Sequence, residues 1–390
     1  MSTAMRFAGS GLRVANRWCS GFALGLLIVA APAHAQVTPT TTTPPPDDNP
    51  SVRVGGTLFA DFTQTFAPTI TDAGGATVSP SAFNVGRAYI NVTGQLNHLF
   101  AFRITPDIVR ETGAGSSVAG SMTLRLKYGY VQMNLDDWLW RGTFARAGMI
   151  QTPYVDFSET VYRYRFQGQV FEEREGYMTS ADYGAAMRTL VPRGYGEIYG
   201  GVYNGEGFTR ADPNNQKAIE LRGTLRPFPS GNVSRGLRVT AFYSGDHTVE
   251  HADRRRTSAL VTFEHRFVNM AWSYLDAVDQ ATPAAPRIPA RGQSFWITPR
   301  LPLGPPPVAP PAGMVRASLE GLFRYDRLEP NRDSTGLKQR WIAGAAYWPR
   351  MRSASYSAAF MLDYEHVGYR DFEPARPLER RLAVHMLVAF

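Results

Sequence analysis

Positively charged side chains recur at alternate positions in several stretches of this chain, with apolar side chains between them. Within residues 218–226, for example, Arg222 and Arg226 alternate with Leu221 and Leu225. A period of two places all the charged side chains on one face of an extended strand. Cations arrayed along a wall in this way raise the local concentration of anions and repel other cations. The pattern therefore predicts a surface that attracts anions.

Basic residues outnumber acidic residues on this polar face. The basic residues that we expect there are Arg87, Arg103, Arg125, Lys127, Arg146, Arg188, Arg222, Arg226, Arg238, Arg316, Arg324, Arg340 and Arg381. The chief acidic residues on the same face are Glu197, Glu220, Glu264, Glu320, Asp326 and Asp363. Arginine and glutamate are ordinary neighbours on adjacent strands. An alternative is therefore that the arginines pair with these carboxylates and only solvate the wall.

The segment 151–180 contains a second group of cations and is the longest connection between the strands that we predict below. It includes Tyr162-Arg163-Tyr164-Arg165, and the run Glu172-Glu173-Arg174-Glu175 follows. Loops of this length in compact folds usually have a function. We expect the two arginines of the first run, with Arg125 and Arg146, to contribute most to anion binding, and the acidic run to attach the segment to the basic wall. The alternative is a surface loop that only packs on its neighbours.

Motifs of other chemistries are absent, because the chain contains no GxxxxGK[ST], HExxH, GxSxG or CxxC pattern. The run 246–253 holds the densest group of potential metal ligands, but it reads as a solvated loop, and we expect neither a metal nor a cofactor. A lipid hydrolase would need Ser and His together on an apolar face, whereas Ser357 and His385 fall on the polar face. The run Arg254-Arg255-Arg256 either binds an anionic sugar lipid or only begins a strand.

Extended strands must position all of these residues. Alternation with a period of two recurs from about residue 52 onward, and no stretch predicts a long helix. The 16 predicted strands span residues 52–62, 82–94, 99–107, 123–134, 142–150, 181–190, 195–204, 217–227, 235–245, 255–266, 268–276, 292–300, 314–327, 336–348, 353–366 and 378–390.

The connections between these strands alternate in length. Short ones, such as 95–98 and 191–194, alternate with longer ones, such as 63–81 and 151–180. Short turns at one rim and long loops at the other are typical of bacterial transmembrane barrels. The proline-rich segment 300–313 departs from this pattern, because it should be a short turn. It indicates either a stiff excursion or a miscounted strand.

Aromatic residues favour a membrane location. Six tryptophans fall on or near strand ends, as interfacial girdles require; they are Trp138, Trp140, Trp272, Trp296, Trp341 and Trp348. The last strand ends at Phe390, which resembles the signal that the barrel-assembly machinery of bacteria reads. We therefore predict an all-β fold, a transmembrane antiparallel β-barrel of 16 strands.

The N-terminal residues have the features of a secretory signal peptide. Arginines precede the apolar run 21–31, and Ala33-His34-Ala35 offers a cleavage site. The Thr/Pro-rich residues 36–50 predict a disordered linker, because such a sequence cannot pack a core. The predicted organisation is a signal peptide at 1–35, this linker, and an outer-membrane β-barrel at 51–390.

Composition agrees with an exported barrel. Of the 390 residues, 19% are charged and 12% are aromatic, whereas ordinary soluble domains carry about 25% charged residues. The single cysteine, Cys19, lies in the predicted signal peptide, so no disulfide is expected in the mature chain. The 41 Lys and Arg residues are dispersed rather than clustered, and we expect no binding of nucleic acid.

One group of motifs lies within residues 146–184. It comprises Arg146-Ala-Gly-Met-Ile-Gln-Thr-Pro153-Tyr154, then Glu159, Glu173-Arg174 and Ala181-Asp182-Tyr183-Gly184. These motifs resemble the phosphate-selective porin O/P family, whose members have a comparable strand end, a constriction loop with a Glu–Arg pair, and an Asp-Tyr-Gly strand start. The resemblance implies a trimeric barrel with a ladder of arginines and a third loop folded into the lumen.

Together, the residues and the resemblance predict a porin through which small hydrophilic solutes diffuse passively, with a preference for phosphate or similar anions. The residues expected to line the pore and bind anions are Arg87, Arg103, Arg125, Lys127, Arg146, Arg163, Arg165, Arg222, Arg226, Arg238 and Arg316. Expected partners are small anionic or polar solutes, outer-membrane lipid, the barrel-assembly machinery through Phe390, and further copies of the chain in a homotrimer. A non-selective or sugar-type porin and a closed structural or adhesion barrel are the alternatives.

Overall fold

The computed structural model describes residues 48–113, 115–247, 249–304, 316–351 and 356–390. The predicted signal peptide, all but the last three residues of the predicted linker, and most of the proline-rich segment lie outside these ranges. The strands of the barrel are β1 (Ser51–Ala67), β4 (Ser81–Gln95), β5 (Phe100–Arg110), β6 (Met122–Asn134), β7 (Phe144–Gln151), β8 (Ala181–Val191), β9 (Gly196–Tyr203), β10 (Ala218–Leu225), β11 (Leu237–Asp246), β12 (Arg254–His265), β13 (Val268–Asp279), β14 (Ile288–Pro302), β15 (Ser318–Glu329), β16 (Leu337–Trp348), β17 (Ser357–Arg370) and β18 (Glu379–Ala389).

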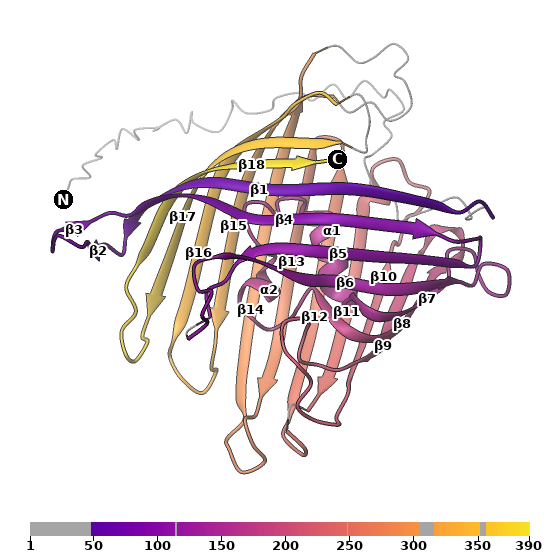
Figure 1. Ribbon diagram of the computed structural model, residues 1–390, viewed down its shortest axis with the longest axis horizontal. Helices are drawn as coiled ribbons and strands as arrows, with labels where there is room; N and C mark the ends of the chain where they lie inside the picture. Colours follow the sequence, from indigo (N-terminus) through magenta and orange to yellow (C-terminus); the bar gives the residue numbers. More distant parts are fainter. Residues whose placement is uncertain (1–47, 114, 248, 305–315, 352–355) are drawn as a thin grey trace, which may run out of the picture. The chain divides into compact units, whose positions relative to one another are not determined.

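These 16 strands form one closed antiparallel barrel, shown in Figure 1. Each strand pairs with its neighbours in the sequence, and β1 closes the ring by pairing with β18, where Asp61 lies opposite His385. Closure leaves no strand edge without hydrogen bonds, as a structure in lipid requires. The strand count and the all-β fold expected from the sequence are confirmed, with the ends of individual strands displaced by up to about five residues.

Side chains alternate between the two faces of the barrel wall. On β10, Arg222 and Thr224 are buried inside, whereas Leu221 and Leu225 are more than half exposed on the outside. Apolar side chains on the outside suit contact with lipid, and polar side chains on the inside suit a water-filled lumen. The charged faces predicted from the sequence therefore point into the barrel.

Three β-bulges interrupt this alternation among the described strands, and in one of them, where β1 pairs with β18, Phe66 is the extra residue. The pairing of β5 with β6 passes from Thr105–Tyr128 to Pro106–Leu126, so Lys127 is an extra residue, and Lys127 and Tyr128 are both buried inside. Gly86 is the extra residue where β4 pairs with β1. A bulge re-aims side chains locally, and here it directs additional groups toward the lumen.

The segment between β7 and β8 folds into the barrel rather than over it. It contains α1 (Pro153–Tyr162) and α2 (Phe171–Arg174); we call residues 152–180 the constriction loop. Pro153 suits a first helical turn because its missing N–H is not needed there. The helix ends at Arg163, which adopts a left-handed conformation with φ of 56°. Among the described residues, no helix is long and apolar enough to cross a membrane.

One face of α1 and the chain after it pack on the inner wall. Val155, Phe157 and Tyr162 are almost fully buried among side chains of β11 to β17, including Phe242 and Leu322. The apolar residues 154, 155, 157, 161 and 162 follow helical spacing. This spacing could have predicted the helix from the sequence. The helix was not among the elements predicted above.

The tryptophan prediction is partly wrong. Trp138, Trp140, Trp272 and Trp341 are exposed on or near the barrel exterior, as an interfacial girdle requires. Trp296 is buried and Trp348 is half-buried, and both contact aromatic residues of the constriction loop at centroid distances of 5.3 to 5.9 Å. Position along a strand does not specify which face a residue occupies. The remaining elements are the short hairpin β2 (Ile70–Thr71) and β3 (Thr77–Val78) and two 3₁₀ turns, Pro192–Gly194 and Ser234–Gly236.

Candidate functional site

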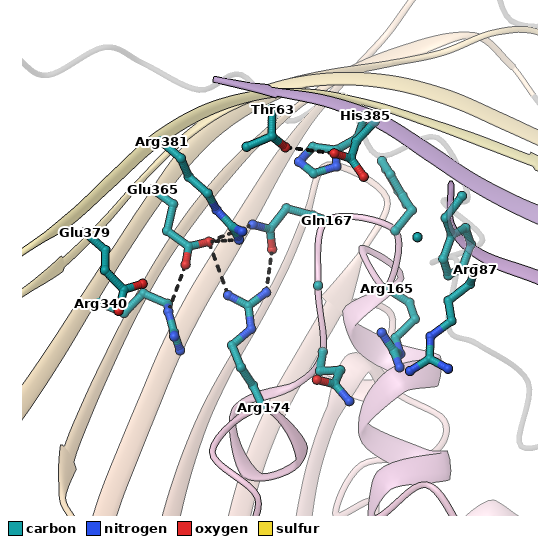
Figure 2. A pocket seen from close by; sticks show the side chains of 16 residues that line it. Thr63, Arg87, Arg165, Gln167, Arg174, Arg340, Glu365, Glu379, Arg381 and His385 are labelled. Atoms are coloured by element: carbon teal, nitrogen blue, oxygen red, sulfur yellow. Dashed lines mark hydrogen bonds and ion pairs between the residues drawn. The ribbon is translucent and has the colours of Figure 1, made fainter. Parts of the chain in front are cut away.

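The lumen narrows to a cavity between the tip of the constriction loop and the wall formed by β1, β4 and β16 to β18 (Figure 2). Its volume is about 430 Å³, large enough for a small hydrated solute. The charged residues that line it are Arg87, Arg165, Arg174, Arg340, Arg381, Asp61, Glu365 and Glu379, with His385 beside them. Five guanidinium groups thus face three carboxylates.

Glu365 on β17 is the centre of this arrangement. Its carboxylate lies 2.6 Å from Arg381 on β18, 3.1 Å from Arg340 on β16 and 3.4 Å from Arg174 of the constriction loop. Figure 2 shows the three guanidinium groups converging on this one side chain. Arg340 has two further acidic neighbours, Glu175 at 2.5 Å and Asp326 at 3.7 Å. Among the described residues, Arg174 and Arg381 pair with no carboxylate except that of Glu365, so these two guanidinium groups share one negative charge and keep an excess of positive charge.

Glu175 attaches the constriction loop to the same wall. Its carboxylate lies 2.5 Å from Arg340 and 2.7 Å from Lys338, both on β16. The acidic run was expected to make such an attachment, and Glu175 is the member that does so. Glu172 instead accepts a hydrogen bond of 2.7 Å from Tyr154 within the loop.

Arg165 reaches the cavity from the loop side. It pairs with Glu159 of α1 and lies 3.6 Å from Glu173 of α2. These two contacts fold the loop back on itself and hold the guanidinium at the edge of the cavity. Arg165 was expected at a constriction, and the structure places it there.

Three other predicted cations lie along β5 to β7 and stack on tyrosines. The charged groups of Arg103, Lys127 and Arg146 lie 4.5 to 5.1 Å from the ring centroids of Tyr128, Tyr89 and Tyr130, respectively. In the described part of the chain, no carboxylate lies within 4.0 Å of any of these three. Stacking on an aromatic face stabilises a cation without cancelling its charge. This part of the wall is therefore also positive.

Other predicted residues are paired, in agreement with the alternative given for them. Arg87 and Arg125 share Asp107, at 2.6 and 3.0 Å. Arg163 lies 2.9 Å from Glu320 on β15 and is not among the residues that line the cavity. Asp107 was not recognised in the sequence as an inward acid.

Four further members of the predicted set do not reach the cavity. Arg222 and Arg238 are buried beside Phe157 and pair with Glu197 and Glu264. Arg226 follows the last residue of β10. Arg316 precedes β15, so its predicted position on that strand is wrong, and it donates to the carbonyl oxygens of Leu303 and Gly304.

The sequence interpretation missed the contribution of Arg174, which was quoted only within a motif. Arg340 and Arg381 were also not among the residues expected to bind anions, although both were predicted to lie on the polar face. The nearest signal for Arg174 was its place directly before Glu175, which binds β16. His385, 2.6 Å from Asp363, is a further lumen-facing group. Within the described ranges, no three His, Cys, Asp or Glu side chains are grouped so as to hold a metal.

A closed antiparallel barrel of 16 strands with a long loop folded into its lumen is the architecture of outer-membrane porins. No known family profile and no curated protein sequence matches this chain. Solved structures do match it. The anion-selective porin from Comamonas acidovorans has 11% sequence identity and a TM-score of 0.57, with 88% of this chain and 100% of that chain covered.

Two further outer-membrane proteins show the same likeness. The in-vitro folded OmpT of Vibrio cholerae, in its trimer form, has 11% identity and a TM-score of 0.53, with 88% of this chain and 100% of that chain covered. OmpF of Salmonella typhi, in complex with daunomycin, has 12% identity and a TM-score of 0.53, with coverages of 87% and 97%. At these identities the likeness establishes the porin fold of the chain and nothing finer.

Proposed function

We propose that this chain is a porin of the bacterial outer membrane through which small hydrophilic solutes diffuse passively, with a preference for anions. The observation that carries the proposal is the charge of the cavity lining, which has five guanidinium groups and three carboxylates and in which Arg174 and Arg381 share a single acid, Glu365. The tyrosine-stacked cations on β5 to β7 extend the positive surface beyond it. Phosphate and similar small oxyanions fit this chemistry, because guanidinium groups bind their oxygens through paired hydrogen bonds.

The physical basis is the field inside a narrow channel. Walls of low dielectric focus the field of lumenal charges, so an excess of cations acts more strongly there than on an open surface. A sphere of the cavity's volume is about 9 Å across, comparable with the Debye length of roughly 8–10 Å at physiological salt, so mobile ions do not screen the excess fully. An anion entering the cavity is therefore stabilised, and a cation is repelled.

The wider organisation belongs to the same proposal. Residues 1–35 would direct export and be removed, residues 36–50 would form a linker, and residues 51–390 would insert into the outer membrane with lipid around them. Homotrimer formation is supported by the trimer form of the Vibrio cholerae protein with the same fold. We assign no catalytic role, cofactor or nucleic-acid partner.

Single-channel recording in planar bilayers tests this proposal. In a potassium chloride gradient, the wild-type zero-current potential should have the sign of chloride permeation. Arg381→Gln, whose side chain is 40% exposed in the lumen, should move that potential toward cation permeation. Arg165→Gln should do the same and weaken any block by phosphate, whereas Arg163→Gln, at a residue that pairs with Glu320 and does not line the cavity, should have a smaller effect.

Arg193→Gln in the turn after β8 is the matched control, since it removes the same charge outside the lumen. A wild-type pore without ion preference would identify a non-selective or sugar-type porin. An absence of conductance from correctly folded protein would identify a closed barrel. A preference for potassium would show that the arginines are paired structural residues.

A further inference from the structure

The outer face of β13 to β16 carries a row of aromatic side chains across four strands. Trp272 lies opposite Phe295, Phe295 opposite Tyr325, and Tyr325 opposite Trp341. Trp272, Phe295 and Trp341 are 41%, 43% and 56% exposed. Outward aromatic rows of this kind lie at the boundary between hydrocarbon and lipid headgroups. The row therefore marks the depth at which lipid headgroups begin.

From this aromatic row toward the rim of the barrel where the constriction loop begins and ends, the next outward-facing residues are polar. The first polar row contains Tyr274, Gln293 and Arg327, which lie opposite one another across β13, β14 and β15. Arg291 lies one step further toward the rim, opposite both Asp276 and Glu329. These positions alternate with buried ones, so they point away from the lumen.

These side chains line a groove on the exterior of the barrel. Its volume is about 240 Å³, and its lining residues are Tyr274, Arg291, Gly292, Gln293, Arg327 and Glu329. A polar groove at this depth lies beside lipid headgroups rather than beside acyl chains. It is separate from the lumenal cavity, because the wall of the barrel lies between them.

The groove carries an arginine that is not neutralised. Arg327 lies 2.8 Å from Glu329, and Arg332 in the following connection lies 3.4 Å from Asp276. Arg291 is exposed, and no carboxylate among the described residues lies within 4.0 Å of its guanidinium group. An exposed guanidinium in a groove, with aromatic rings below it, suits a phosphate attached to an apolar body.

We propose that this groove binds the phosphorylated headgroup of a glycolipid in the outer leaflet, with Arg291 as the principal contact. The phosphate would lie against Arg291 and Arg327, the sugar against Tyr274 and Gln293, and the acyl chains over Phe295 and the apolar surface below. The aromatic row is the reason to assign a lipid rather than a free phosphate, because only a lipid also contacts that surface. The proposal depends on the outer-membrane location but not on solute transport.

The run Arg254-Arg255-Arg256 was the candidate for such a lipid in the sequence, and it does not provide the site. Arg254 lies 3.0 Å from Asp246, and Arg256 lies 2.6 Å from Asp279 and donates to the backbone carbonyl of Tyr177 in the constriction loop. Only Arg255 is exposed. Two of the three guanidinium groups are therefore occupied by the protein itself.

Lipid binding to the detergent-solubilised full barrel tests the proposal. The probe is lipid A carrying its phosphates, titrated and counted as bound adducts by native mass spectrometry, with dephosphorylated lipid A and phosphatidylcholine in parallel. Wild type should prefer the phosphorylated lipid. Arg291→Gln breaks no ion pair and should weaken its binding about fivefold, the effect of one arginine at an anionic surface. Arg193→Gln, at the opposite rim, should bind as wild type does.

Equal binding by wild type and Arg291→Gln would overturn the proposal, as would equal binding of the phosphorylated and dephosphorylated lipids. Inorganic phosphate that displaces the lipid at equal concentration would reassign the groove to a free anion. Heat-modifiable mobility in electrophoresis establishes that each variant is folded. Unchanged channel conductance in Arg291→Gln separates this result from any failure of the proposed transport.

Discussion

The backbone of Gly168 lies directly against the guanidinium group of Arg174, and a Cβ built on that glycine would overlap Nη2 of the arginine. Both residues belong to the part of the constriction loop that lines the cavity. The missing side chain leaves Arg174 room to donate to Gln167, at 3.2 Å, and to lie against Glu365. The position of this lumenal cation therefore depends on a glycine.

Replacement of Gly168 by alanine should change the pore without unfolding the barrel. The added methyl group would overlap the guanidinium group of Arg174 and must shift it within the cavity, so we expect lower single-channel conductance and a shifted zero-current potential. The control is Gly223→Ala on β10, where a Cβ would have no neighbouring atom within 4 Å. Wild-type conductance and selectivity in Gly168→Ala would show that Arg174 does not contribute to the constriction.

Contact between the end of the linker and the short-turn rim should depend on pH. The Nδ1 atom of His98 lies 2.5 Å from Asp48, and its Nε2 atom lies 3.2 Å from Asp137. The hydrogen bond with Asp48 raises the pKa of His98 above its ordinary 6.5, and the hydrogen bond with His98 lowers the pKa of Asp48 below its ordinary 3.8.

The pH dependence of this contact follows from the directions of the two pKa shifts. The contribution of His98 is complete below pH 6.5 and is lost as pH rises through the raised pKa; that of Asp48 is lost as pH falls through the lowered pKa. The contact should hold between the two pKa values and weaken as pH rises through the raised pKa of His98. NMR titration of the His98 ring checks this, since Asp48→Asn should return its pKa toward the ordinary value. An unchanged titration would mean that the contact is absent in solution.

The C-terminal residue should influence assembly. The backbone N–H and C=O of Phe390 each form a hydrogen bond of 3.0 Å with Gly56, and its ring lies over that glycine. Phe390→Ser keeps the backbone bonds but removes the ring, so any defect isolates the aromatic side chain. We expect reduced outer-membrane abundance or slower insertion, measured by heat-modifiable mobility, with Phe390→Tyr close to wild type. Normal assembly of Phe390→Ser would count against recognition of this residue.

The rim that carries the constriction loop should face the exterior of the cell. Asn97 lies in the short connection between β4 and β5, and Ala284 lies at the opposite rim, between β13 and β14. A cysteine at Ala284 should react with a membrane-impermeant reagent in intact cells, whereas a cysteine at Asn97 should react only after lysis. The reverse pattern would invert the proposed orientation.

The strands could be predicted from the sequence because lipid imposes a strict alternation on each of them. On β15 every second residue from Ser318 to Leu328 is buried or paired inside, and this regularity is visible in the sequence alone. The prediction of which residues face the lumen fails where a single residue breaks the alternation. The bulge at Lys127 changes which face of the barrel wall the neighbouring residues occupy. Nothing in the composition of β6 predicts the extra residue.

The candidate site was less predictable, because it depends on contacts between distant segments. Facing alone grouped Arg222 and Arg238 with Arg87. All three form ion pairs, but Arg222 and Arg238 are buried away from the cavity, whereas Arg87 lines it. Which side of the lumen stays open depends on where the constriction loop packs. That is decided by Tyr162, Tyr164 and their partners on the wall, which are more than a hundred residues away in the sequence.

The constriction loop is tied to three neighbouring strands, through Arg163 to β15, Glu175 to β16 and Arg174 to β17. A loop held by ion pairs at three points cannot move aside as one body. The pore should therefore keep a constant diameter and should not open and close by movement of this loop. Its open current should be steady, with little flicker, and its size cut-off should be the same at every membrane voltage that leaves these ties intact. A cell that needs more of the permeating solute would then have to make more copies of the barrel, because the individual pore has no wider setting.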